Sequence, residues 1–146
     1  MKKIILIVDD NSANLYLLKN LLESEGMEVI GAQNGKEALE KAQAHPPDII
    51  ISDILMPVMD GYTFCREVKA DKRLQDIPFI FYTATYTEKK DETFALSLGA
   101  DSFIIKPQEP DVLVGLLSKF FSGERQAKPI ATKPLGEEME FFRKHN

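Results

Sequence analysis

Short apolar runs alternate with longer amphipathic stretches over the first 121 residues of this chain. The runs have the length of strands and lie at 4–8, 29–32, 49–51, 79–82 and 103–105. The stretches between them have helical length, and this alternation is typical of βαβ units that build a parallel sheet. The first, third and fourth runs are almost wholly apolar, as in strands covered on both faces. The pattern therefore predicts an α/β domain with five strands and five helices.

Capping and helix-breaking residues set the expected limits of the helices. We expect them at 12–25, from Asn34 to His45, from Asp60 or Gly61 to about Ala70, from Tyr86 or Thr87 to Gly99, and from Pro110 to about Phe121. Asn34 and Glu37, three residues later, are arranged like a capping box. Gly26 and Gly99 are favourable residues just beyond a helix end. Each helix would return the chain to the start of the next strand.

Four of the strands end in residues with strong chemical character. The first is followed by Asp9 and Asp10, the third by Asp53, the fourth by Thr83, and the fifth by Lys106 and Pro107. The carboxyl ends of parallel strands meet at one edge of the sheet, where ligands of such folds bind. Three carboxylates, a hydroxyl and an ammonium group at that edge indicate a site for a divalent cation and a phosphoryl group.

Each of these residues also has an ordinary structural role. Asp10 or Asn11 can cap a helix, Asp53 can occupy a turn, Thr83 suits a strand, and Lys106 can be a surface lysine. In favour of a site, neighbouring carboxylates repel each other unless a cation neutralises them, and Mg²⁺ prefers oxygen ligands. A carboxylate is also a competent nucleophile toward phosphorus. The proline makes a cis Lys106–Pro107 bond available, and the sequence leaves cis and trans open.

Composition excludes several other classes of function. The net charge is −5, and no cluster of basic residues provides the phosphate-neutralising surface of a nucleic-acid-binding protein. No apolar run approaches the roughly 20 residues of a membrane helix, and the N-terminus lacks the features of a signal peptide, so we expect a cytoplasmic protein without membrane contact. Cys65, the single cysteine, is expected to be a buried structural thiol, and His45 and His145 have no zinc-ligand spacing.

Residues 122–146 differ from the domain before them. The segment 122–134 contains Gly123, Pro129 and Pro134 and is expected to be a linker. After it, an apolar face of Leu135, Met139 and Phe142 predicts a short helix. Three alternatives remain for that helix: it continues into an output domain that is absent here, it is a frayed tail, or it docks on its own domain.

The ordered set of motifs resembles the receiver domain of two-component response regulators. The set consists of the acid pair, Asp53 with the Met-Pro and Asp-Gly that follow it, Thr-Ala, and Lys-Pro, and it covers residues 1–121. The resemblance implies a flavodoxin-like, doubly wound parallel sheet of order 2-1-3-4-5. It also implies a phosphorylation-dependent switch rather than a metabolic enzyme. Such a domain supports its own phosphotransfer and autodephosphorylation.

The same resemblance implies a role for each acidic residue. Asp9, Asp10 and Asp53 would hold Mg²⁺ together with the backbone carbonyl of Leu55. Asp53 would accept a phosphoryl group from the phosphohistidine of a sensor histidine kinase or phosphotransfer protein, or from a small donor such as acetyl phosphate. Further implied partners are an output domain or protein that contacts the fourth and fifth helices, or a second copy of the chain.

The resemblance also implies a conformational switch. Thr83 and Lys106 would bind the phosphoryl oxygens, and Phe103 would turn inward as Thr83 moves, which changes the surface of the fourth helix, fifth strand and fifth helix. Phe103 lacks the hydroxyl of the tyrosine frequent in the family, so burial of its ring should favour the inward state. Leu55 and Thr85 occupy positions that tune the phosphate lifetime, and we expect Leu55 to shield the phosphate from water.

Two other classes of protein share parts of this pattern. A phosphohydrolase with an aspartyl nucleophile also uses Asp, Thr, Lys and Mg²⁺, but such enzymes typically carry two acids spaced two residues apart on the first strand, whereas Asp9 and Asp10 are adjacent. A flavin or nucleotide binder would use the same sheet, but no glycine-rich phosphate loop follows the first strand. Both are weaker interpretations than a receiver.

Overall fold

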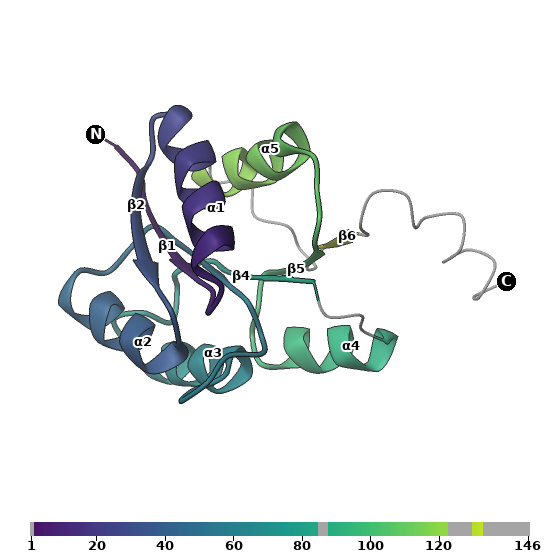
Figure 1. The fold of residues 1–146 in the computed structure, drawn as a ribbon. Coiled ribbons are helices and arrows are strands. Elements are labelled where there is room, and N and C mark those ends of the chain that lie inside the picture. The colour runs from purple at the N-terminus through teal and green to yellow at the C-terminus, as the bar shows by residue number, and fades with distance from the viewer. Residues whose placement is uncertain (1, 85–87, 123–129, 133–146) are drawn as a thin grey trace, which may run out of the picture.

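The computed structural model describes residues 2–84, 88–122 and 130–132, which form a parallel sheet with helices on both faces (Figure 1). The strands are β1 (Ile4–Val8), β2 (Glu28–Ala32), β3 (Ile49–Ser52), β4 (Phe79–Thr83), β5 (Ser102–Ile105) and β6 (Ile130–Thr132). The helices are α1 (Ser12–Ser24), α2 (Gly35–Ala44), α3 (Gly61–Ala70), α4 (Lys89–Ser97) and α5 (Pro110–Phe121). Within the described ranges, the strand order is β2-β1-β3-β4-β5-β6 and all pairs are parallel. The predicted five-strand order 2-1-3-4-5 is confirmed.

Side-chain caps fix the start of three helices. The Oδ1 atom of Asn11 accepts a hydrogen bond at 3.0 Å from the backbone N–H three residues later, at the start of α1. Asn34 and Asp60 cap α2 and α3 in the same way, at 2.9 and 2.8 Å. These bonds satisfy N–H groups that a helix start otherwise leaves unpaired. Because Asn11 caps α1, Asp10 does not take the capping role that was its structural alternative.

The fourth helix is described from Lys89 onward. Its predicted start at Tyr86 or Thr87 lies outside the described residues. Glu88 precedes the helix, and its backbone N–H donates a hydrogen bond to the Asp91 carboxylate at 3.0 Å as part of a capping box. In the described parts of the chain, no helix combines the length and the apolar character needed to cross a membrane.

The sheet separates two apolar cores. Helices α1 and α5 cover one face, and α2, α3 and α4 cover the other (Figure 1). Successive side chains of β1 alternate between them: Ile5 and Ile7 face α1 and α5, whereas Leu6 and Val8 face the other helices. The core under α2–α4 contains the fully buried rings of Phe64, Phe79, Phe81 and Phe103. Burial of one such ring contributes about 1.5–3 kcal/mol, so the four rings together stabilise the packing of α2, α3 and α4 on the sheet.

Cys65 lies on α3, inside the core that α2, α3 and α4 cover. Its side chain is fully buried, and burial raises the pKa of the thiol to about 12. A thiol rather than a thiolate is therefore present at neutral pH, which makes the group a poor nucleophile. The expected structural role is confirmed.

A sixth strand corrects the expectation for the segment after α5. Ile130–Thr132 lies inside the segment 122–134 that we expected to be only a linker, and it pairs in parallel with β5, with Ser102 opposite Ile130 and Ile104 opposite Thr132. The three residues are too few to show a strand period between two prolines, yet the open backbone groups at the edge of β5 provide a template for pairing. The predicted helix at 135–142 lies outside the described residues.

Candidate functional site

The carboxyl edge of the sheet gathers the residues that the sequence singled out. Backbone hydrogen bonds hold them in place: the N–H of Asp9 donates to the Ala32 carbonyl at 3.1 Å, and that of Asp53 to the Val8 carbonyl at 2.9 Å. The N–H of Lys106 donates to the Thr83 carbonyl at 2.8 Å. Each functional side chain therefore continues directly from a strand and is positioned by its neighbour in the sheet.

Three carboxylates form the acidic part of the site. Asp9, Asp10 and Asp53 each offer one oxygen, and these oxygens all lie within 4.8 Å of one another. Asp9 is buried and Asp53 half-buried, whereas Asp10 is exposed. Oδ1 of Asp9 accepts a hydrogen bond from the Asn11 N–H at 2.9 Å, and Oδ1 of Asp53 accepts one from the Ile54 N–H at 2.7 Å. The cluster fits a hard divalent cation that keeps part of its coordination sphere open.

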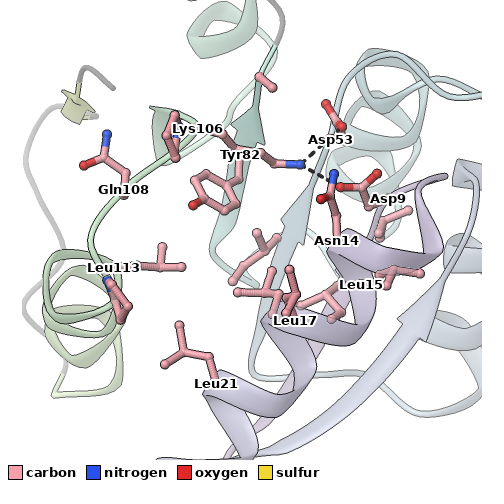
Figure 2. Close-up of a pocket in the computed structure, with 17 residues that line it drawn as sticks. Asp9, Asn14, Leu15, Leu17, Leu21, Asp53, Tyr82, Lys106, Gln108 and Leu113 are labelled. Atoms are coloured by element: carbon pink, nitrogen blue, oxygen red, sulfur yellow. Dashed lines mark hydrogen bonds and ion pairs between the residues drawn. The ribbon is translucent and has the colours of Figure 1, made fainter. Parts of the chain in front are cut away.

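Lys106 reaches the same cluster from β5. Its Nζ atom lies 2.6 Å from Oδ2 of Asp9 and 3.4 Å from Oδ2 of Asp53 (Figure 2). The ammonium group also lies 5.3 Å from the centre of the Tyr82 ring, within cation–π range. Burial raises the pKa of the Tyr82 phenol. The Lys106–Pro107 bond is cis, the isomer that the sequence left open.

Thr83 ends β4, and Phe103 lies on the neighbouring strand β5 with its ring on the α2–α4 side of the sheet. Both side chains are fully buried. The Phe103 ring packs in the core with Phe81, at 6.3 Å between ring centres. The predicted switch residue is thus in an inward position in this structure, as burial of an apolar ring favours.

The loop from β3 to α3 carries Asp53 and Leu55. Leu55 points largely to solvent, with 62% of its surface exposed. Gly61 closes the loop, because its N–H donates to the Ile54 carbonyl at 2.8 Å and a Cβ at this position would stand 2.1 Å from the Asp53 carbonyl oxygen. Only glycine permits this approach. Gly61 was predicted from the sequence only as a helix start, and its close approach to the Asp53 carbonyl was not predicted.

The same loop contains an unusual turn. Val58 has φ of 70°, a conformation that a β-branched residue rarely adopts, and it lies between Pro57 and Met59, whose N–H donates to the Pro57 carbonyl at 2.7 Å. The neighbouring Met59 carbonyl accepts a hydrogen bond from the Gly35 N–H at 2.9 Å. The loop is therefore tied to the start of α2, which limits its movement beside Asp53.

A cavity of about 540 Å³ adjoins the acidic cluster between α1 and α5 (Figure 2). Its polar end is formed by Asp9, Asp53 and Lys106, and its apolar walls include Leu17, Leu21 and Leu113. The cavity was not among the features predicted from the sequence. The signal was the continuous apolar stretch Leu15–Leu18, which is wider than one buried helical face requires.

Comparisons with known proteins agree with this geometry. The family model described as response regulator receiver domain matches residues 5–118. The alkaline phosphatase synthesis transcriptional regulatory protein PhoP of Bacillus subtilis (strain 168) is 39% identical over 110 residues, which cover 75% of this chain and 45% of PhoP. The chain therefore spans less than half the length of that relative.

Two further proteins match almost over their whole length. The polar-differentiation response regulator DivK of Brucella anthropi is 39% identical over 107 residues, covering 73% of this chain and 86% of DivK. The receiver domain of a sensor histidine kinase from Pseudomonas aeruginosa PAO1, solved with a magnesium ion coordinated in its active site cleft, is 29% identical with a TM-score of 0.77 and covers 84% of this chain and 99% of that one. This chain belongs to the family of response regulator receiver domains, the phosphorylation-dependent switches of two-component signalling.

Proposed function

We propose that Asp53 is the phosphoacceptor of this receiver. The observation that carries the proposal is the convergence of three carboxylates and Lys106 on one point at the carboxyl edge of the sheet. Lys106 lies close to two of the three acids, and of these Asp9 is buried and in direct contact with the ammonium group, whereas Asp53 is half-buried with its Oδ2 3.4 Å from Nζ and is the more accessible to a donor. That position allows a donor phosphoryl group to approach an oxygen whose negative charge is already stabilised nearby.

The donor is a phosphohistidine of a sensor histidine kinase or a phosphotransfer protein. An oxygen of Asp53 forms the new bond to phosphorus, the bond from phosphorus to the imidazole nitrogen breaks, and that nitrogen retains the electron pair and takes up a proton. Lys106 and the Thr83 hydroxyl bind the oxygens of the transferred group, which carry its negative charge. The product is an aspartyl phosphate on this chain and a free histidine on the donor.

Mg²⁺ is the cation that suits the acidic cluster. Asp9, Asp10 and Asp53 would hold it, together with the backbone carbonyl of Leu55, and when bound it neutralises charge on the incoming phosphoryl oxygens. The hard oxygen ligands favour Mg²⁺ over softer metals. The magnesium ion in the Pseudomonas receiver supports this choice.

The output is a change of surface rather than a released product. Thr83 is buried at the end of β4, the strand that pairs with β5 and Phe103, so a movement of Thr83 toward the phosphate would leave space into which the buried Phe103 ring can shift. The surface of α4, β5 and α5 changes as a result and is offered to an output domain, a partner protein or a second copy. A phosphohydrolase is the less favoured alternative, since its acids are typically two residues apart.

Phosphorylation by acetyl phosphate tests the proposal directly. We expect intact-protein mass spectrometry to show one added phosphoryl group in the presence of Mg²⁺, located at Asp53 by peptide mapping, and little adduct with a chelator present. Asp10→Asn should raise the Mg²⁺ concentration needed for half-maximal phosphorylation by about tenfold, because one carboxylate ligand becomes neutral and the affinity for Mg²⁺ falls. A modification at any other residue would contradict the assignment, and steady hydrolysis of a generic phosphate ester would favour the phosphohydrolase.

The lifetime of the phosphate is expected to depend on Leu55. Its exposed side chain stands two residues after Asp53, where it can shield the acyl phosphate from water. Leu55→Asn should speed dephosphorylation by up to about tenfold, a barrier change of about 1.4 kcal/mol. Val58→Asn is the matched control, because Val58 is exposed in the same loop and asparagine tolerates its positive φ. An equal or slower loss of phosphate in Leu55→Asn would exclude the shielding role.

A further inference from the structure

The ammonium group of Lys106 lies among the oxygens that a divalent cation would use. Its Nζ atom is 2.6 Å from Oδ2 of Asp9 and 3.4 Å from Oδ2 of Asp53, and Oδ1 of Asp9 accepts the Asn11 N–H at 2.9 Å. Both oxygens of Asp9 therefore have a donor. A cation held by Asp9 and Asp53 would lie close to a second positive charge, and the two would repel each other. Binding of Mg²⁺ must therefore move the ammonium group away from the carboxylates.

The Tyr82 ring offers the ammonium group a second position. The Nζ atom lies 5.3 Å from the ring centre, and both side chains line the cavity between α1 and α5 (Figure 2). The face of an aromatic ring attracts a cation, and this attraction is stronger where water is excluded. Only 14% of the Lys106 side chain is exposed, and the cavity of about 540 Å³ leaves room for a short movement toward the ring.

The ring itself is held in a fixed place. Its body packs against the buried apolar cluster that α1 and α5 cover. Its phenol oxygen forms a hydrogen bond with the backbone of Gln108, two residues after Lys106. The core and the β5–α5 loop therefore both position the ring, so that a flexible lysine side chain meets a rigid partner beside the acceptor site.

We propose that Tyr82 is a positioning residue for Lys106, and that its ring receives the ammonium group when Mg²⁺ occupies the acidic cluster. This inference rests on the Mg²⁺ binding proposed above. The ring keeps the displaced ammonium group beside Asp53, where it is ready to bind the oxygens of the transferred phosphoryl group. A strand residue that packs in the core on one side thus also tunes the affinity for the metal.

The ring matters more to the metal-bound state than to the metal-free state. Without metal, two carboxylates hold the ammonium group at 2.6 and 3.4 Å, and a ring at 5.3 Å adds little to ion pairs this short. With metal bound, the charge of these carboxylates is neutralised, and the ring supplies the attraction that they no longer give. Loss of the ring therefore destabilises mainly the metal-bound state, and the affinity for Mg²⁺ falls.

Two substitutions separate the ring of Tyr82 from its hydroxyl group. Tyr82→Leu keeps an apolar side chain but removes the ring, whereas Tyr82→Phe keeps the ring and removes only the hydroxyl and its bond to Gln108. We expect Tyr82→Leu to weaken Mg²⁺ binding by about three- to tenfold, and Tyr82→Phe to change it by less than about twofold. Titration of the Asp10 and Ile54 amide signals by NMR measures this affinity without phosphorylation.

Leu113→Ala is the control for packing. Leu113 is buried and lines the same cavity, but it has neither a ring nor a charge to offer Lys106. The variant should be less stable than the unmodified chain and should bind Mg²⁺ with unchanged affinity. A fall in affinity equal to that of Tyr82→Leu would assign the effect to packing and overturn the role of the ring.

The Hε protons of Lys106 report the position of the ammonium group directly. Protons above an aromatic ring resonate upfield, so these signals should move further upfield when Mg²⁺ is added to the unmodified chain or to Tyr82→Phe. No such movement is expected in Tyr82→Leu. Isotope-labelled lysine makes the signals visible, and Lys106→Arg identifies them by their loss.

The inference is overturned if the Asp10 and Ile54 amides titrate with Mg²⁺ while the Hε signals stay in place or move downfield. The metal site would then stand and only the role of Tyr82 would fail. Equal Mg²⁺ affinities of Tyr82→Leu and Tyr82→Phe would overturn the inference as well. If the amides did not respond to Mg²⁺ at all, the proposed metal site and the inference would both fail. A failure of Asp53 to accept phosphate would leave all these measurements unchanged.

Discussion

Asp53→Asn is expected to abolish phosphorylation of the domain. The amide is nearly the same size as the carboxylate but lacks the charge and nucleophilicity that attack on phosphorus requires. We expect the rate of adduct formation with acetyl phosphate and Mg²⁺ to fall by roughly 10³-fold or more, the scale seen when a nucleophile is removed. Intact-protein mass spectrometry over a time course measures this rate.

The control for this variant is Asp111→Asn, which removes an exposed aspartate in the first turn of α5 that does not belong to the acidic cluster. It makes the same chemical change and should leave the rate unaltered. Because Asp53 contributes one of the repelling carboxylates, Asp53→Asn should fold at least as well as the unmodified chain, so a loss of phosphorylation would not reflect unfolding. Normal phosphorylation of Asp53→Asn would refute the assignment of the acceptor.

Gly61→Ala is expected to destabilise the whole domain. The added Cβ would stand 2.1 Å from the Asp53 carbonyl oxygen and 2.9 Å from Cα of Ile54, and both are backbone atoms that cannot rotate away. The loop between β3 and α3 must shift, at a cost of about 3 kcal/mol in the free energy of unfolding. Because the loop carries Asp53, phosphorylation should slow as well. Urea unfolding and the acetyl phosphate assay measure the two effects.

Gly115→Ala provides the opposite result under the same chemical change. Gly115 lies inside α5, and a Cβ there would meet nothing within 4 Å. Alanine should stabilise the helix by roughly 0.5–1 kcal/mol, since glycine loses more backbone entropy on folding. If Gly61→Ala unfolded at the same urea concentration as Gly115→Ala, the contact between Gly61 and Asp53 would have no energetic importance.

The order of strands and helices could be predicted from the sequence because its local signals agree. Apolar runs such as 4–8 and 79–82 mark buried strands, and Asn34 and Asp60 mark helix starts. The strand Ile130–Thr132 could not be predicted, because its pairing depends on the open edge of β5, a partner distant in sequence. Edge pairing leaves almost no pattern in three residues.

The meeting of the acidic residues and Lys106 at one edge could be predicted from the sequence, but the packing around them could not. Asp9, Asp10, Asp53 and Lys106 follow strands, and parallel strands must bring such residues to one edge. The contact between Gly61 and the Asp53 carbonyl depends on how two loops pack, which no residue pattern encodes. The exposure of Leu17 depends on the cavity between α1 and α5. The helical period alone cannot distinguish a residue that faces the core from one that lines a cavity.

The alternation of side chains along the strands has a consequence for how the domain can evolve. Phe103 belongs to the core on one side of the sheet, and the next residue, Ile104, belongs to the core on the other, where the cavity between α1 and α5 lies. The buried residues of the two sides form separate apolar clusters. Under the switch proposed for Phe103, changes to the surface beside α1 can therefore accumulate while the phenylalanines on the other side of the sheet stay constant, so input and output can diversify independently in one small domain.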